Sequence, residues 1–231
     1  MAQKRVPAQP SGLDEWPPQL AKARLYGQLV VDIIVGRLRP GEKLDERTLA
    51  KRYGGGVAGI REALTRLALE GLVQRRPRVG TLVAPLDLVE ARDAFAARAL
   101  VETACAGLAA RHASPGDIAA ISGSLKDGES AIARNDVRAL AIMDEAFHVA
   151  VAQASHNRVL AKLVVSLHRQ TARFWLHAMG KPSLKENRRA LARHRELAAG
   201  IAAHDEGRAQ TAMRKVFGDF PADIKRAWEA P

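Results

Sequence analysis

The sequence predicts a mainly α-helical protein of two domains, in which three small helices and a β-hairpin precede an all-α bundle of about six helices. Three observations support this prediction. Apolar residues recur at helical spacing along most of the chain, strand-like runs occur near 72–83, and the composition becomes rich in Ala and Leu after Pro85. The 231 residues are enough for two domains of ordinary size. We expect an N-terminal arm at 1–19, one domain at 20–84 and another at 85–231.

The first domain is expected to begin near Leu20, after a mobile arm. Residues 1–18 contain four prolines and no hydrophobic period, so they have no means of forming a packed core. Beyond them, apolar residues three and four positions apart indicate three amphipathic helices. These helices are predicted near 20–36, 46–53 and 60–69.

A basic β-hairpin is predicted after the third helix. Its strand-like runs are 72–75 and 81–83, and Arg76–Gly80 joins them. The whole chain has 36 basic and 25 acidic residues, a formal charge of +11. Residues up to Ala84 hold 15 basic and 8 acidic side chains (+7), against 21 and 17 (+4) in the rest. A positive excess in the first third favours a polyanionic partner.

The second domain is predicted to be helical throughout. Helix-start signals occur at Ser114-Pro115 and Asn135-Asp136. Gly218 and Pro221 are expected to bend or interrupt the last helix. Aromatic residues make up 4% of the chain, so the core must be built from Leu, Ile, Val and Ala at helix crossings. The helices are expected near 87–111, 115–133, 136–155, 157–178, 184–203 and 205–228.

The sequence also indicates where the protein works. Cys105 is the single cysteine, which excludes a disulfide scaffold and favours a reducing compartment. The N-terminus lacks the apolar core of a signal peptide, and no stretch approaches the length of a membrane span. We therefore expect a cytoplasmic protein with no membrane partner.

Three small helices followed by a basic hairpin form the element order of a winged helix-turn-helix, whose third helix enters the major groove of DNA. Short motifs support this assignment along 25–84. They are Ile34–Gly41, Leu44, Leu49-Ala50, Ile60–Leu64, Leu67, Glu70–Val73 and Gly80. With these motifs the segment resembles the GntR family of bacterial transcription regulators. The resemblance implies a protein that binds a double-stranded DNA operator.

The resemblance also implies which side chains contact DNA. Arg47 and Arg61 match positions at which family members use arginine on phosphates and bases. Arginine suits both tasks, because its planar fork donates two hydrogen bonds to a phosphate or to a guanine. The hairpin would add Arg75, Arg76, Arg78 and Gly80. The alternative for the hairpin arginines is an ordinary solvated turn.

One segment departs from the family pattern. Gly55–Gly59 has the sequence Gly-Gly-Val-Ala-Gly, where members usually have a stretch such as Val-Ser-Arg-Thr-Pro. The change removes a helix-capping hydroxyl, whose loss typically costs about 0.5–2 kcal/mol, and an arginine that faces the groove. An alternative function is therefore non-specific DNA binding with degraded sequence readout.

In the second domain, Asp144 and His148 stand four residues apart on one helix face, and His194 lies on a later helix that could cross it. A carboxylate with neutral imidazoles suits a divalent cation such as Zn, Ni or Mn. The alternative is a solvated pair or an ordinary core contact. The other histidines have no matching partner at ligand spacing, so we interpret most of them as surface or capping residues. They are His112, His156, His168, His177 and His204.

Further motifs extend over 87–217. They are Arg98 with Glu102, Ala109-Ala110, Asp144–His148, Ala154-Ser155, Asn157 and Arg193-His194. Together they resemble the FCD effector domain of FadR-type GntR regulators. The resemblance implies a helical pocket in which an Asp and three His hold a metal, beside a small carboxylate effector. Asp144, His148 and His194 match three ligand positions, but the fourth falls on Val216, which cannot ligate.

The metal site implied by the resemblance is thus incomplete by one imidazole. Water or effector could fill the vacancy, another residue such as Asp219 could replace the ligand, or the site binds no metal tightly. We expect a weakened or effector-completed site. Arg98 matches the position that grips an effector carboxylate, and its alternative role is a helix-surface ion pair with Glu102.

These features predict a one-component regulator, in which a homodimer binds a palindromic operator and a small organic acid switches it. A metal-dependent hydrolase or lyase built on the same bundle is the alternative from another class. We expect no enzyme, because the chain contains no H-E-x-x-H, G-x-S-x-G or similar constellation.

Overall fold

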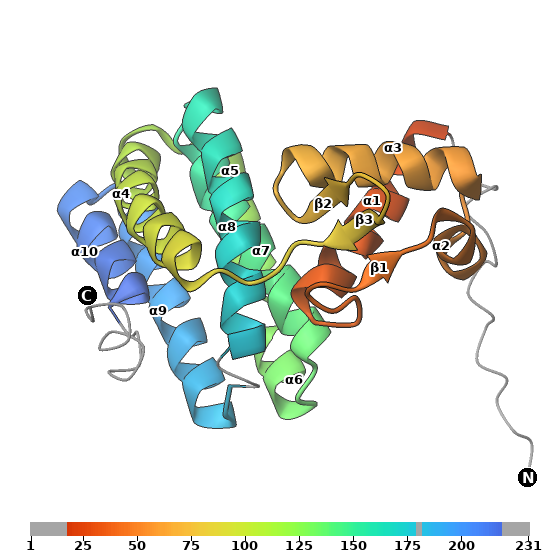
Figure 1. Cartoon of the computed structure of the whole chain (residues 1–231). Coiled ribbons are helices and arrows are strands. Elements are labelled where there is room, and N and C mark those ends of the chain that lie inside the picture. Colours follow the sequence, from red (N-terminus) through yellow and green to blue (C-terminus); the bar gives the residue numbers. More distant parts are fainter. Residues whose placement is uncertain (1–17, 179–181, 219–231) are drawn as a thin grey trace, which may run out of the picture. The chain divides into compact units, whose positions relative to one another are not determined.

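The computed structural model describes residues 18–178 and 182–218. Most of the arm expected at 1–19 lies outside the described residues, but Pro18 and Gln19 already belong to the first helix. The described part is mainly helical with one small sheet, so the predicted fold class is confirmed (Figure 1).

The described residues form two compact units. One unit holds the residues up to Asp32 together with Arg39–Ala84. The other holds Ile33–Leu38 and the residues from Pro85 onward.

The first unit combines three helices with a three-stranded antiparallel sheet. Its elements are α1 (Pro18–Ile34), β1 (Lys43–Leu44), α2 (Glu46–Tyr53), α3 (Gly56–Leu69), β2 (Val73–Arg76) and β3 (Gly80–Val83). β3 is the central strand. The sequence does not predict β1, because a two-residue strand has no pattern of its own and exists through its pairing with β3. The core contains the buried side chains of Leu25, Leu29, Ile60, Leu64, Leu67, Leu72 and Val83.

The second unit is an all-α bundle. Its helices are α4 (Leu88–His112), α5 (Pro115–Ser124), α6 (Gly128–Ala133), α7 (Val137–Ala154), α8 (Arg158–Ala178), α9 (Leu184–Ala202) and α10 (Glu206–Phe217). Ser114 and Asp136 cap α5 and α7 through their side chains, as the start signals predict. His156 and His204 adopt left-handed conformations just after α7 and α9, which is a usual way to end a helix. The described part of the last predicted helix ends at Phe217.

One prediction for this bundle is wrong. The single helix expected at 115–133 is two helices, α5 and α6, separated by a turn in which the Gly128 amide donates to the Leu125 carbonyl. The turn brings Gly128 against Leu191 of α9, where an added Cβ would meet a methyl group at 2.9 Å. Periodicity could not show this break, because both halves bury residues on one continuing apolar pattern.

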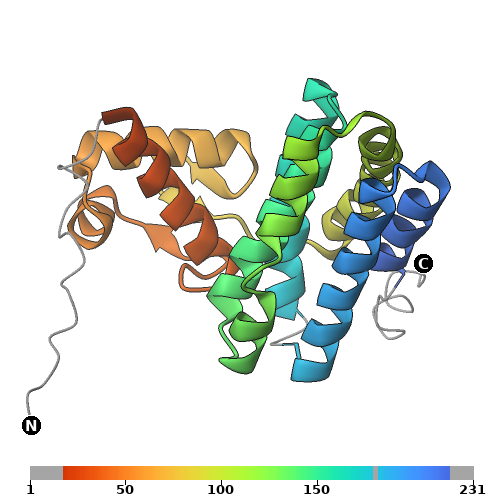
Figure 2. The same cartoon turned by 180° about the vertical axis from the view of Figure 1, so that it is seen from behind.

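Small residues allow the helices of the bundle to approach closely. Figures 1 and 2 show α10 beside α4 and α9. A Cβ on Gly200 of α9 would lie 3.0 Å from the Ala209 amide nitrogen of α10, and one on Gly107 of α4 would meet Gln210. Alanines fill much of the surrounding core, as the low aromatic content predicts, and Phe147 is its largest fully buried side chain.

None of the described helices is long and apolar enough to cross a membrane.

Candidate DNA-binding surface and candidate metal centre

Arg61 links the third helix to the second. Its Nη2 lies 2.7 Å from Oε2 of Glu46 in α2, and its Nε also donates to that carboxylate. The hydrogen bond from Arg61 lowers the pKa of Glu46, and Glu46 raises the pKa of the guanidinium in return. The Arg61 side chain is nevertheless 63% exposed. The ion pair therefore holds the Arg61 guanidinium in a defined position that faces solvent. Arg47, the second residue of α2, is also exposed.

The hairpin places a second arginine against the third helix. Nη2 of Arg75 donates to Oγ1 of Thr65 over 2.6 Å, and Thr65 lies one turn after Arg61. Arg76 donates instead to Gln74 of its own strand over 3.3 Å. At the hairpin turn, Arg78 and Gly80 have φ angles of 64° and 110°. Arg61 and Arg75 are thus brought to one side of α3, and all three hairpin arginines are exposed.

The glycine-rich segment is helical over most of its length, which corrects the expected start of α3 at Ile60. The helix begins at Gly56, after a run of positive φ angles of 77°, 74° and 66° at Gly54, Gly55 and Gly56. Glycine adopts such angles without a steric penalty. Gly55 takes the N-cap position and supplies no side-chain hydrogen bond, so the predicted loss of the capping hydroxyl is observed.

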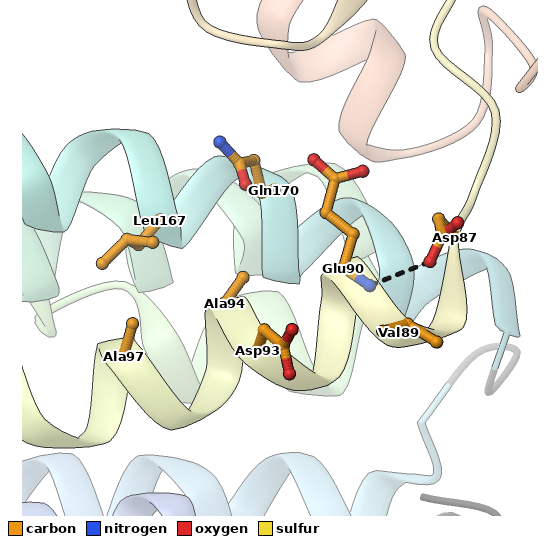
Figure 3. A pocket seen from close by; sticks show the side chains of 8 residues that line it. All are labelled: Asp87, Val89, Glu90, Asp93, Ala94, Ala97, Leu167 and Gln170. Carbon is orange, nitrogen blue, oxygen red and sulfur yellow. Dashed lines mark hydrogen bonds between the residues drawn. The ribbon is translucent and has the colours of Figure 1, made fainter.

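A surface cavity of about 580 Å³ lies between α4 and α8 in the second unit (Figure 3). Three carboxylates line it, those of Asp87, Glu90 and Asp93. Its apolar lining comes from Val89, Ala94, Ala97 and Leu167. Like charges repel, so this cavity does not suit an organic acid.

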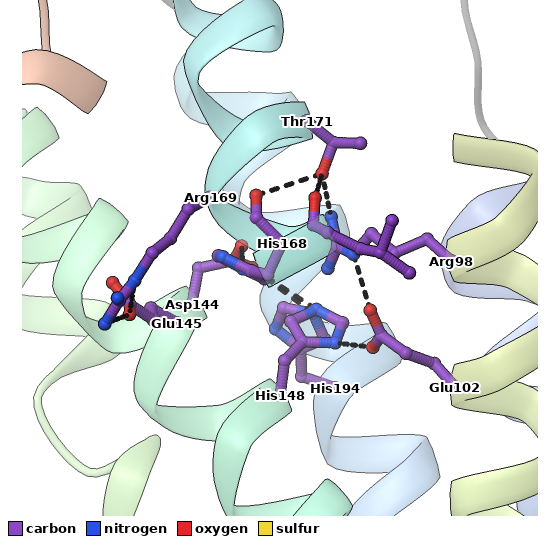
Figure 4. A network of polar contacts seen from close by, with 10 residues as sticks. Arg98, Glu102, Asp144, Glu145, His148, His168, Arg169, Thr171 and His194 are labelled. Carbon is purple, nitrogen blue, oxygen red and sulfur yellow. Dashed lines mark hydrogen bonds and ion pairs between the residues drawn. The ribbon is translucent and has the colours of Figure 1, made fainter. Parts of the chain in front are cut away.

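Four side chains of types that can bind a metal meet elsewhere in the bundle, three buried histidines and a partly exposed aspartate (Figure 4). Asp144 and His148 come from α7, His168 from α8 and His194 from α9. Oδ2 of Asp144 lies 2.9 Å from Nε2 of His168, and Oδ1 lies 3.5 Å from Nε2 of His194 and 3.8 Å from Nε2 of His148. The structure therefore brings together the three candidate ligands that the sequence analysis names and adds a third histidine.

The interpretation of His168 as a surface or capping residue is wrong. Its side chain is 1% exposed and faces Asp144. Val164 and Thr171 stand four residues before and three after His168, and both are fully buried in the structure. Residues at this spacing share a helix face. A search by ligand spacing within one helix misses such a residue, since its partners lie on other helices.

Behind the imidazoles stands a buried ion pair between Arg98 and Glu102 of α4. Nε of Arg98 lies 2.5 Å from Oε1 of Glu102, and its Nη1 donates to Oγ1 of Thr171 over 2.8 Å. The other Glu102 oxygen contacts Nδ1 of His148. The expected alternative for Arg98, an ion pair with Glu102, is thus present, but it lies in the interior and not on the helix surface.

The charges of this cluster control its protonation. Burial alone would raise the pKa of Glu102, but Arg98 and His148 outweigh it and lower that pKa to about 2. Desolvation likewise opposes ionisation of Asp144, yet the hydrogen bond from His168 and the neighbouring imidazoles hold its pKa well below the ordinary value. Burial lowers the pKa of His168, and that of His194 to about 4. Two ionised carboxylates thus lie in one cluster with His168 and His194, whose lowered pKa values favour the neutral ring. An ionised carboxylate and a neutral imidazole are the forms that bind metals.

The donor set fits a divalent cation. A carboxylate oxygen of Glu102 contacts Nδ1 of His148, which leaves Nε2 of that ring on the side of Asp144. Nε2 is therefore the ring nitrogen of His148 that can reach a cation bound by Asp144. Nδ1 of His168 and Nδ1 of His194 are buried without a hydrogen-bond partner in the described part of the chain, so both rings direct their polar contacts to Asp144 through Nε2. Carboxylate and imidazole together suit Zn, Ni or Mn.

Position 216 does not contribute a ligand. Val216 of α10 packs against the apolar core of the bundle. The next residue, Phe217, lies with its ring centroid 6.4 Å from that of His148 and 5.2 Å from the Arg98 guanidinium carbon. The replacement ligand suggested at Asp219 lies outside the described residues.

Comparisons with known proteins agree with this architecture. A model described as "Bacterial regulatory proteins, gntR family" matches residues 21–83, and one described as "FCD domain" matches 93–219. The HTH-type transcriptional repressor GlaR of Escherichia coli (strain K12) is 30% identical, over 82% of this chain and 89% of its own. The HTH-type transcriptional regulator LutR of Bacillus subtilis (strain 168) is 29% identical, over 77% of this chain and 89% of its own.

The fold is also similar to that of a solved structure, E. coli McbR/YncC. The likeness has a TM-score of 0.77 with 19% sequence identity, and it covers 90% of this chain and 98% of the other. The matched relatives are transcriptional regulators and not enzymes, which agrees with the absence of a catalytic constellation in the sequence. The FCD match alone spans more than half of the chain. The chain therefore belongs to the GntR family and is a DNA-binding transcriptional regulator with a C-terminal FCD effector domain.

Proposed function

We propose that this regulator binds a palindromic operator as a homodimer and that a small organic acid, bound in the FCD domain, changes its affinity for that operator. One observation carries the proposal. The buried guanidinium of Arg98 and the metal-ligating side chains of Asp144, His148 and His194 form one connected polar cluster inside the bundle. Guanidinium groups bind carboxylates through paired, charge-assisted hydrogen bonds.

The proposed effector site assigns a task to each part of the cluster. Asp144, His148 and His194 would hold a divalent cation such as Zn, Ni or Mn, which supplies positive charge for an anionic effector. Arg98 would orient the effector carboxylate by exchanging a donor from Glu102 or Thr171. Glu102 would orient the His148 ring through its contact with Nδ1.

Effector binding would act on DNA through a shift in populations. An effector that binds one arrangement of the dimer better than another favours that arrangement by the difference in affinity. The effector weakens operator binding if the α3 helices of the two subunits are no longer spaced by one turn of DNA in the effector-bound dimer. In that case the affinity for the operator falls by the ratio of the effector's affinities for the two arrangements.

The homodimer is supported by exposed apolar side chains on α4 and α8, two helices that pack against each other. Leu100 of α4 is 75% exposed and Val159 of α8 is 69% exposed, and Val89 and Leu163 add to the same two helices. Apolar patches of this kind on a regulator mark an association surface. A symmetric pair of FCD domains would present two DNA-binding domains to the two halves of a palindrome.

Sequence readout is proposed to rest on Arg61, Arg47 and the hairpin arginines. The arrangement of Arg61 and Arg75 beside α3 supports this assignment. Because the protein must reach chromosomal DNA, we place it in the cytoplasm. Non-specific binding is the second candidate, because α3 begins without a side-chain cap and carries Val57 at the position where the resemblance to the family implies an arginine.

Selection from a random pool of DNA duplexes at about physiological ionic strength tests the proposal, since phosphate contacts alone give only weak binding there. We expect the wild-type protein to enrich a short palindrome. The Arg61→Ala variant should lose that preference, whereas Arg134→Ala, which changes an exposed arginine of the second unit, should keep it. Enrichment of no sequence by the wild-type protein would favour non-specific binding, and an unchanged palindrome with Arg61→Ala would refute the assigned role.

A further inference from the structure

We propose that His168 is the fourth protein ligand of the metal site, so that α8 supplies the imidazole that α10 lacks at Val216. This inference rests on the proposed metal site of Asp144, His148 and His194 and completes it. The site would then hold its cation with one carboxylate and three imidazoles, and would need neither the effector nor water to restore the lost donor.

Distances around Asp144 carry the first step. Metal–nitrogen and metal–oxygen bonds of about 2.0–2.2 Å place neighbouring ligand atoms about 3.3–3.6 Å apart in a tetrahedral site and about 2.8–3.1 Å apart in an octahedral one. The Nε2 atoms of His168, His194 and His148 lie 2.9, 3.5 and 3.8 Å from an oxygen of Asp144. His168 is thus the closest of the three imidazoles to the carboxylate.

Mutual proximity carries the second step. Ligand atoms of Asp144, His148 and His168 all lie within 4.8 Å of one another. The rings of His148 and His168 are tilted, with centroids 5.2 Å apart, while those of His148 and His194 stand edge to face at 5.1 Å. His148 is therefore in ring contact with both of the other imidazoles.

The burial of His168 carries the third step. Its side chain is 1% exposed, and its Nδ1 has no hydrogen-bond partner in the part of the chain that the structure describes. Nε2 is therefore the nitrogen through which His168 makes its polar contact among the described residues, and that contact is with Asp144. His148 and His194 face the same carboxylate, so Nε2 of His168 is directed at the group that the two other imidazoles share.

The position of His168 also links the metal site to Arg98. The Thr171 hydroxyl donates to the His168 carbonyl oxygen at 3.0 Å and accepts from Nη1 of Arg98 at 2.8 Å. The Thr171 hydroxyl therefore connects the backbone of His168 to Arg98, the arginine proposed to hold the effector. A histidine at 216 would lie on α10 instead, next to Phe217, and could not make this connection.

Zinc binding by the full-length chain tests the inference. The protein is first stripped of metal with a chelator and then titrated with Zn²⁺ alone, in competition with a chromogenic chelator. We expect His168→Gln to weaken Zn²⁺ binding at least tenfold, Asp144→Ala to abolish it, and His112→Gln, at an exposed histidine of α4, to leave it unchanged. Unfolding curves recorded without metal show whether each variant is folded.

X-ray absorption at the zinc edge provides a second readout that does not depend on affinity. We expect three imidazoles around zinc in the wild type and two in His168→Gln. Equal affinity and three imidazoles in both proteins would overturn the role of His168 while leaving the site of Asp144, His148 and His194 intact. A wild-type chain that binds no Zn²⁺, Ni²⁺ or Mn²⁺ would overturn the metal site itself, and the DNA selection would still decide the regulatory function separately.

Discussion

Each unit of this protein contains an arginine–glutamate ion pair, and the two pairs lie in opposite environments. In the first unit, Arg61 pairs with Glu46 at the surface, and its guanidinium faces solvent, where a phosphate or base can reach it. In the second, Arg98 pairs with Glu102 in the interior, beside a histidine cluster. An arginine–carboxylate ion pair therefore positions a side chain for a large external partner in the first unit. In the second unit, the same kind of pair helps to organise an internal site. Substitutions should separate affinity for DNA from stability accordingly.

The largest effect is expected from Glu102→Ala. This change leaves Arg98 buried without its carboxylate and removes the partner of His148 Nδ1. Breaking one member of a buried ion pair typically costs about 3–5 kcal/mol. Denaturant unfolding of the full chain measures the loss. The matched change Glu46→Ala should cost far less, because exposed ion pairs contribute little, and an equal loss from both variants would contradict the comparison.

A smaller change in the free energy of unfolding is expected when Zn²⁺ is added to the wild-type protein. A ligand that binds the folded chain alone adds about 2.7 kcal/mol of stability at a hundredfold excess over its dissociation constant. Zn²⁺ should therefore shift the unfolding midpoint of the wild type and of His112→Gln. Asp144→Ala should show no shift, since it lacks the carboxylate that all three imidazoles face. A Zn²⁺ shift that persists in Asp144→Ala would place the ion elsewhere.

Arg61→Ala should affect DNA binding and spare the fold. Loss of one bidentate base contact reduces affinity for the matching site by about ten- to a hundredfold. Fluorescence anisotropy with the selected operator measures this change. The unfolding midpoint should stay close to that of the wild type, because the side chain is 63% exposed. A large fall in stability with unchanged affinity would assign Arg61 to the fold and not to DNA.

The smallest effect is expected from Arg78→Gly at the hairpin turn. Arg78 has a φ of 64°, which glycine adopts without strain, so the turn should keep its shape. If Arg78 contacts a phosphate, binding should weaken by a similar factor on every sequence, and the slope of log affinity against log salt should fall by about one. Titrations at several salt concentrations give this slope. An unchanged slope would leave Arg78 in a solvated turn.

The sequence by itself determined the class of fold and the character of both units. The three helices and the basic hairpin can be predicted from local patterns. The period of apolar residues and the charge of a turn both depend on residues that are close together in the sequence. The i, i+4 pair of Asp144 and His148 is local in the same sense. The split of α5 from α6 at Gly128 is not, since it depends on contact with Leu191 of α9.

Only the tertiary structure decided what surrounds Asp144. His168 and His194 stand 24 and 50 residues further along the chain, and the packing of α8 and α9 against α7 determines whether their rings reach the carboxylate. The packing of α4 against α7, α8 and α10 converts Arg98 and Glu102 from a helical pair at ordinary spacing into a buried one. Ligand sets and buried charges are properties of surfaces brought together from several helices, so no pattern within a single helix contains them.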